Sequence, residues 1–150
     1  MRGTPAPFYS LINTTLDGDP AVVVVNTALR TFDGRDAFPW HLRIVIACRG
    51  LGEKGMPNPE EVAVITRLGE CLEAAVEVDG NAVFLARITV RGERVLLYRV
   101  HDPEQANDGL QHLLATSEPV RAWQFQMEYD LGWNLARPEL DLPLRDSEVN

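Results

Sequence analysis

The sequence predicts one α+β domain of the ferredoxin-like type, a two-layer sandwich with two helices on one face of an antiparallel sheet. Three observations predict this fold: strand-like alternation of apolar and polar residues, helical spacing of apolar residues, and the order β-β-α-β-β-α-β along the chain. The 150 residues, 45% of them hydrophobic, suffice for one core. We expect a single domain over 1–150, with an ordered core at about 8–135 and an irregular acidic tail at 136–150.

The strands are predicted from alternation or from β-branched residues. Successive side chains of a strand point to opposite faces, so 123–131 has an apolar row and a polar row. The polar row consists of Gln124, Gln126, Glu128 and Asp130. The other strands are expected at 21–29, 41–48, 82–91 and 94–101, with a type II′ turn at Gly92-Glu93.

The two helices have clear start signals. Asn58 can cap the first helix, Pro59 takes its first position, and Glu61 can complete a capping box. Asp102 and Pro103 repeat the signal for the second helix. Both helices are expected on one face of the sheet, which leaves the other face open.

The polar row of 123–131 is expected to lie on this open face. Depending on strand register, it would be joined there by His41, Arg43, Arg87, Thr89, Arg99 and His101. A solvated face with ion pairs between strands is the simpler interpretation, and a docking face for a partner is the alternative.

The net charge of -8 is unevenly distributed. Five acids and six bases precede Pro59, whereas 17 acids and eight bases lie from Pro59 on. The acidic second half would repel a phosphate backbone, so nucleic acid is not expected as a direct ligand. It would attract a basic protein partner, although the charge can also serve solubility alone.

The N-terminal segment lacks the apolar stretch of a signal peptide, and no apolar run approaches the length of a membrane span. Cys48 and Cys71 are too few for a disulfide scaffold and are expected to be small buried residues. We therefore expect a cytoplasmic protein with reduced thiols and no membrane partner.

No motif predicts a catalytic residue, a cofactor or a metal site. Residues 50–55 match G-x-G-x-x-G, but Met56, Pro57 and Asn58 separate the motif from the helix, which in a dinucleotide site begins within the motif. The three histidines lack metal-ligand spacing. An enzyme acting on a small polar substrate is the alternative. Its pocket would be lined by His41, Arg43, Arg99 and His101.

Four stretches are distinctive: FPWHLRIVI, GMPNPEEVAVITRLGECLEAAV, RVLLYRVHDPEQ and WQFQMEYDLGW. By these the chain resembles the bacterial domain-of-unknown-function family numbered 695, over roughly 21–133. The second helix and the segment from Asp130 to Trp133 are similar, more distantly, to the regulator of ribonuclease E activity B family, which are small acidic ferredoxin-like nuclease inhibitors. These resemblances imply the fold and a lack of known catalysis, and no catalytic residue is carried over.

The leading hypothesis is a non-enzymatic protein-binding module, a small acidic regulator or inhibitor of a basic partner such as a nuclease, with a toxin immunity protein as one version. The expected partner-binding residues are Gln126, Glu128 and Asp130 of the last strand and Asp33, Arg35 and Asp36 of the first long loop. A scaffold that forms homodimers through the open face is a third hypothesis. The simpler interpretation of the strand end is that Asp130 caps a turn and Trp133 folds back on the core.

Overall fold

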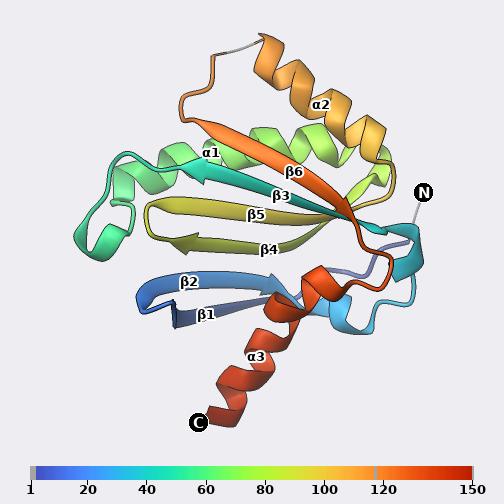
Figure 1. The fold of residues 1–150 in the computed structure, drawn as a ribbon, viewed down its shortest axis with the longest axis horizontal. Coiled ribbons are helices and arrows are strands. Elements are labelled where there is room, and N and C mark those ends of the chain that lie inside the picture. Colours follow the sequence, from blue (N-terminus) through green and yellow to red (C-terminus); the bar gives the residue numbers. More distant parts are fainter. Residues whose placement is uncertain (1–2, 117, 150) are drawn as a thin grey trace.

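The computed structural model describes residues 3–116 and 118–149, and a six-stranded antiparallel sheet forms its centre (Figure 1). The strand order is β1-β2-β4-β5-β3-β6. The strands are β1 Tyr9–Leu16, β2 Asp19–Asn26, β3 Trp40–Ala47, β4 Ala82–Val90, β5 Glu93–Val100 and β6 Trp123–Tyr129. The predicted α+β class is therefore confirmed, whereas the prediction of only five strands and two helices is wrong.

Helices α1 (Pro59–Val76) and α2 (Pro103–Thr116) begin where the sequence predicts. The Asn58 side chain accepts a hydrogen bond from the Glu61 N–H at 2.8 Å. The carboxylate of Glu61 does not complete the capping box; it accepts from the Arg49 N–H and pairs with Arg121. The Asp102 carboxylate accepts from the N–H groups of the second and third residues after it.

These two helices cover one face of the sheet with a continuous apolar core. The core residues include Leu42, Ile44 and Ile46 of β3, Ile65 and Leu72 of α1, and Leu110 of α2. Each is fully buried, as the helical and strand periodicities require. In the described part of the chain, no helix combines the length and the apolar character needed to cross a membrane.

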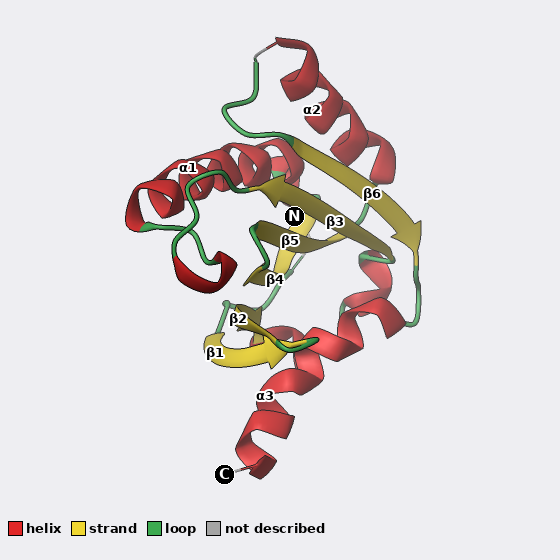
Figure 2. Cartoon of the chain, turned by 60° about the vertical axis from the view of Figure 1, so that its left-hand side comes forward, coloured by secondary structure: helices red, strands yellow, loops and turns green. Residues whose placement is uncertain are grey.

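The opposite face is also partly covered, which corrects the prediction of an open face. The expected irregular tail is a helix, α3 (Arg137–Val149), which lies beside β1 and β2, far from α2 (Figures 1 and 2). Val45 and Leu97 alternate with residues of the first core, so they point to the other face. They share a second core with residues of η1 (Thr27–Thr31), η5 (Asn134–Ala136) and α3.

The N-terminal hairpin of β1 and β2 was not predicted. Its turn consists of Asp17 and Gly18, both with positive φ (51° and 86°), as in a type I′ turn. Asp-Gly between alternating residues is a strong hairpin signal, so the sequence did contain the information.

The turn between β4 and β5 lies one residue earlier than predicted. Val90 pairs with Glu93, and the turn residues Arg91 and Gly92 both have positive φ (49° and 72°). This is the pattern of a type I′ turn rather than the predicted type II′ turn.

A β-bulge between Phe84 and Ala86 shifts the alternation of β4 by one residue, so each later side chain of the strand points to the face opposite the predicted one. Arg87 and Thr89, expected on the open face, therefore lie on the α1 side of the sheet. There the Thr89 hydroxyl accepts a hydrogen bond from Nε of Arg94 at 3.2 Å. A bulge of this kind has no reliable sequence signal, which is why the prediction failed.

Candidate functional site

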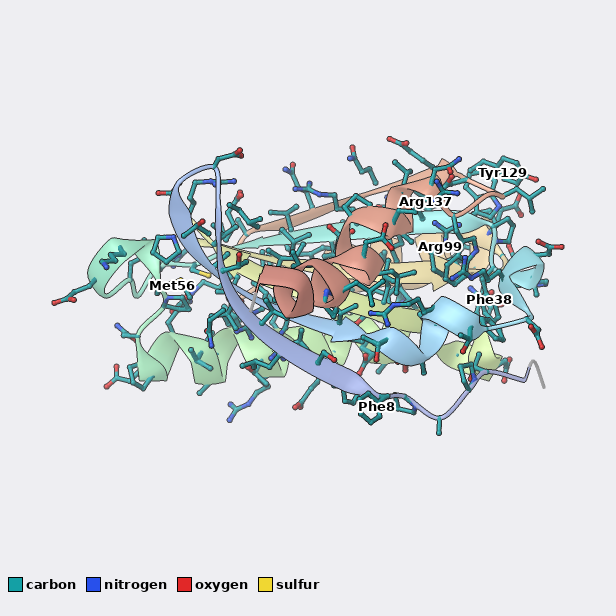
Figure 3. All side chains as sticks on the ribbon, turned by 90° about the horizontal axis from the view of Figure 1, so that it is seen from below. Phe8, Phe38, Met56, Arg99, Tyr129 and Arg137 are labelled. Carbon is teal, nitrogen blue, oxygen red and sulfur yellow. The ribbon has the colours of Figure 1, made fainter. Side chains whose placement is uncertain are left out.

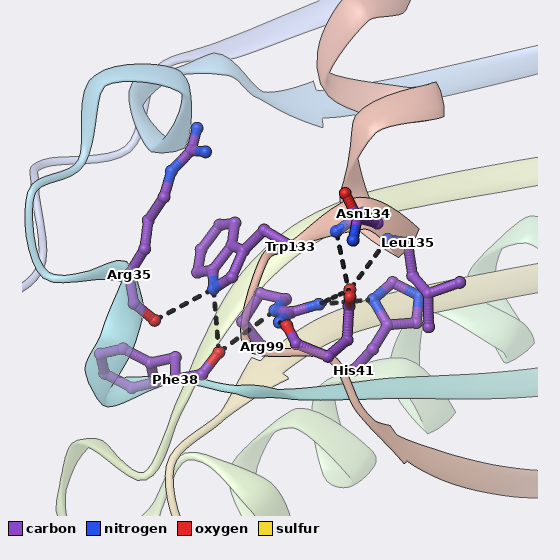
Figure 4. Close-up of polar contacts among 8 residues, drawn as sticks. Arg35, Phe38, His41, Arg99, Trp133, Asn134 and Leu135 are labelled. Atoms are coloured by element: carbon purple, nitrogen blue, oxygen red, sulfur yellow. Dashed lines mark hydrogen bonds and ion pairs between the residues drawn. The ribbon is translucent and has the colours of Figure 1, made fainter.

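Arg99 of β5 is fully buried at the centre of a polar cluster (Figure 4). Its Nη1 donates to Oδ2 of Asp130 at 3.0 Å, and its Nη2 donates to the Asp130 carbonyl at 2.6 Å. Its Nε donates to the Phe38 carbonyl at 3.3 Å. Burial lowers the pKa of Arg99, and the Asp130 carboxylate opposes that shift. The buried cation is thus held by one carboxylate and two carbonyls, as desolvated charges require.

Asp130 joins this cluster to the start of the C-terminal segment. Besides Arg99, its carboxylate accepts hydrogen bonds from the N–H groups of Asn134 (3.1 Å) and Leu135 (2.8 Å). Burial acts to raise the pKa of Asp130, but the bonds from Leu135 and Arg99 outweigh it, so the pKa lies below its usual value. The interpretation of Asp130 as a turn-capping residue is therefore confirmed.

His41 of β3 lies against the same guanidinium, with Nδ1 at 3.2 Å from Nη1 of Arg99. Burial, and then the positive charge of Arg99, lower the pKa of His41 to about 4. The imidazole is therefore neutral at pH 7, and its Nδ1 can accept the hydrogen bond.

Trp133 closes the cluster and is almost fully buried, as the simpler interpretation predicts. Its Nε1 donates to the carbonyls of Arg35 (3.0 Å) and Phe38 (3.1 Å). The guanidinium carbons of Arg99 and Arg35 lie 4.6 and 5.0 Å from the centroid of its ring. Its φ of 58° is unusual for a bulky residue, and these contacts hold it there.

The cluster acts as a clamp rather than as a reactive centre. Each of its polar side chains already has partners in the fold, and together they tie β5, the end of β6 and the loop 32–39 into one unit. The Asp130 N–H also donates to the Pro39 carbonyl at 2.7 Å. The clamp therefore fixes the exposed end of β6 beside that loop.

The polar row of β6 is exposed. We call Gln124, Gln126 and Glu128 the docking strip, after the docking hypothesis of the sequence analysis. Gln126 pairs across the sheet with Arg43, and Glu128 pairs with His41. Of the partner-binding residues predicted on this strand, Gln126 and Glu128 are therefore accessible, whereas Asp130 is largely enclosed by the clamp. Tyr129, 61% exposed, lies at the periphery of the molecule (Figure 3).

The predicted partner-binding residues of the loop 32–39 also divide into accessible and enclosed ones. Asp33 and Asp36 are exposed, whereas Arg35 is half-buried and committed to the fold. Nη2 of Arg35 donates to the carbonyls of Leu29 (3.0 Å) and Arg30 (2.7 Å). The clamp brings the two loop acids to the same end of the molecule as the end of the docking strip.

The four residues of the alternative enzymatic pocket do not line one cavity, although His41 and Arg99 are in contact within the clamp. His41 and Arg43 line a hollow of about 300 Å³ with Glu139, and neither Arg99 nor His101 lines it. His101 instead lies with Nδ1 at 2.6 Å from the Ala37 carbonyl. Within residues 3–116 and 118–149, no group of three or more acidic, histidine or cysteine side chains is placed to hold a metal ion.

With this geometry established, comparison with known families identifies the chain. The model of DUF695, described as a family of unknown function, matches residues 9–136. The chain belongs to the DUF695 family. The predicted resemblance is thus confirmed. No curated protein matches the chain, so the more distant resemblance to the regulator of ribonuclease E activity B stays a prediction.

The DUF695 match contains the whole clamp, the docking strip and the loop acids. It ends at Ala136, one residue before α3 begins. The family region therefore includes the surface that the sequence singled out, and the helix that covers the second face lies beyond it.

The clamp itself was missed by the sequence-based reasoning, which placed Arg99 on an open face. A signal was available: Arg99 lies in RVLLYRV, a strand that is otherwise mostly apolar. A strand buried on both faces needs a partner for such a charge. The cysteine prediction also needs correction in this DUF695 chain, because Cys71 is exposed and Cys48 is only half-buried.

Proposed function

We propose that this DUF695 protein is a non-enzymatic protein-binding module that docks a basic partner along β6 and the loop 32–39. The contact residues would be Gln124, Gln126 and Glu128 of the docking strip and the loop acids Asp33 and Asp36. Asp130 and Arg35 were also expected to contact the partner. In this proposal they do not touch it and instead hold β6 and the loop 32–39 in place through their contacts within the fold.

The observation that carries the proposal is that β6 is an edge strand with an exposed polar row. It pairs with β3 on one side, and no strand of residues 3–116 and 118–149 pairs with its other side. Such an edge offers unpaired backbone N–H and C=O groups to a partner strand. The exposed side chains beside it add sequence specificity.

Exposed apolar residues at the end of β6 point to the other face of the strand and supply an anchor beside the strip. Tyr129 is 61% exposed and packs edge-on against Trp40, with ring centroids 5.3 Å apart. Leu131, two residues later, is also exposed. An exposed aromatic residue is a common binding hot spot, and the accessible acid Glu128 next to it suits a basic surface.

An inhibitor or immunity protein of a nuclease is one form of this role, because nucleases have basic surfaces that bind phosphates. The strand order β6-β3-β5-β4, with α1 and α2 as the crossovers, supports assigning this part of the chain to the ferredoxin-like fold. The free thiols of Cys48 and Cys71 support a reducing compartment such as the cytoplasm.

Site-specific photo-crosslinking tests the proposal. A photoreactive amino acid at Gln126 should give a crosslinked product with a basic protein in the source cell. The same amino acid at Glu104, an exposed residue of α2, is the matched control and should give none. Equal crosslinking at both positions, or none at Gln126, would contradict docking at the strip.

A second copy of the chain is the other occupant to distinguish. Size-exclusion chromatography with light scattering should give the mass of a monomer. A dimer that dissociates on substitution of Gln126 and Glu128 by lysine would show that the strip pairs copies of this chain and would overturn the proposed partner.

A further inference from the structure

A small polar pocket lies between α1 and the sheet, on the face opposite the docking strip. Its volume is about 150 Å³. Its polar lining consists of Thr66, Glu70 and Glu73 of α1 and Arg87, Arg94 and Tyr98 of β4 and β5. Nothing in the proposed docking role uses these residues.

Arg94 is the residue that requires explanation, since it is buried (6% exposed) without a carboxylate partner. Its Nε and Nη1 donate only to the hydroxyls of Thr89 (3.2 Å) and Thr66 (3.1 Å). By contrast, buried Arg99 has Asp130 and buried Glu61 has Arg121. Among the described residues, no ion pair includes Arg94.

A second cation adds to the positive charge at the sheet wall. Arg87 lines the same pocket, and burial together with the charge of Arg87 lowers the pKa of Arg94 to about 10. Two guanidinium groups that face one pocket without a bound carboxylate form a natural site for an anionic group, because guanidinium binds planar oxyanions in a bidentate manner.

The negative charges of the pocket lie on the other wall. Glu70 is exposed, and the half-buried Glu73 accepts a hydrogen bond from the Tyr98 hydroxyl at 3.2 Å. The cation Arg94 is therefore deep, whereas the carboxylate of Glu70 is at the solvent side. A ligand that is only an anion would meet repulsion from these two acids, whereas one that also carries a positive end would not.

We propose that this pocket binds a small zwitterion of the α-amino-acid class, with its carboxylate on Arg94 and Arg87 and its ammonium group toward Glu70 and Glu73. Ile65, Phe84 and Leu96 also line the pocket and can contact a short aliphatic side chain. The volume limits the ligand to a small amino acid.

Isothermal titration calorimetry with single compounds tests this assignment. The probes are glycine, L-alanine and L-serine, compared with acetate, methylammonium and inorganic phosphate. At least one amino acid should bind about tenfold more tightly than each singly functional probe. If no amino acid binds, or if phosphate or acetate binds as tightly as the best amino acid, the proposal is overturned.

Two variants locate the ligand's ends. Arg94→Gln should weaken amino-acid binding about 30-fold, as for removal of one partner of a buried charge pair. Arg91→Gln, an exposed arginine at the turn of the same hairpin, is the matched control and should leave the affinity unchanged.

Glu70→Gln keeps the test decisive even if Arg94→Gln does not fold, because Glu70 is exposed. It should weaken amino-acid binding by about two- to fivefold and leave acetate binding undiminished. An amino-acid affinity that is the same in Glu70→Gln and in the wild type would overturn the placement of the ammonium group.

Discussion

Arg99 illustrates how a single residue can be misjudged from its neighbours in sequence. Alternation placed Arg99 on the same face of the sheet as Arg43 and Glu128. The strand register confirms this face, because His41 lies opposite Arg99 on one neighbouring strand and opposite Glu128 on the other. What alternation could not show is that the chain after β6 folds back over this end of the face. Trp133 and Asp130 then enclose the guanidinium, so the residue belongs to the interior.

Removing the carboxylate of the clamp should destabilise the fold strongly. Asp130→Asn leaves the Arg99 cation buried without a counterion, which costs about 3–5 kcal/mol. Urea unfolding measures this free energy. Asp19→Asn removes the carboxylate of the half-exposed Arg91–Asp19 pair, and its effect should stay below about 1 kcal/mol. Similar effects of the two substitutions would contradict the clamp.

Glu61 should make stability depend on pH in the acid range. The hydrogen bond from Arg121, opposed by burial and assisted by backbone N–H groups, lowers the pKa of Glu61 from 4.5 to about 2. The stabilisation is complete above pH 4.5 and is lost as the pH falls toward 2. We expect a loss of about 1–2 kcal/mol over this range, and a smaller loss in Arg121→Gln. An identical acid profile in the variant would refute the assignment.

At the scale of elements, helices with capping signals were predicted well, and β1 and α3 were missed. Asn58 with Pro59 and Asp102 with Pro103 fix helix starts by local chemistry, so a sequence reveals them directly. The segment of α3 contains Pro138 and Pro143, which argue against a helix. Pro138 falls in the first turn, where proline is tolerated, and packing of Leu140 on the second core supports the helix.

The packing of α3 predicts a contrast between two of its leucines. Leu140 is 3% exposed, whereas Leu144 is 47% exposed. Leu140→Ala should destabilise the protein by about 2–4 kcal/mol, and Leu144→Ala should cost less than about 1 kcal/mol. Thermal and urea unfolding compare the two. Equal, small effects would mean that α3 does not close the second core.

Glu139 of α3 should make the stability of the fold depend on pH in the opposite direction from Glu61. Burial, partly offset by a backbone hydrogen bond and by Arg43, raises the pKa of Glu139 from 4.5 to about 7. The folded state therefore binds the proton more tightly, and stability decreases as the pH rises from 4.5 to 7. Glu139→Gln should remove about 1–3 kcal/mol of this decrease, while the exposed Glu104→Gln should not.

At the scale of the molecule, the sequence predicted the α+β class, the antiparallel sheet and the exposed polar row of β6. Those features follow from local periodicity and capping. The cover on the second face, the clamp and the pocket at Arg94 depend on contacts between segments far apart in the chain. In particular, the bulge in β4 places Arg87 on the same face of the sheet as Arg94, and no residue pattern in the sequence predicted this bulge.

The docking surface is the central claim, and its electrostatic part can be measured once the crosslinked partner is isolated. The affinity for that partner should be determined over a range of salt concentrations for the wild type, for Asp36→Lys with Glu128→Lys, and for the control Glu104→Lys with Asp108→Lys on α2. We predict that the first double variant binds at least about tenfold more weakly with a shallower salt dependence, and that the control stays within about twofold. Wild-type affinity and salt dependence in the Asp36→Lys, Glu128→Lys variant would contradict the account.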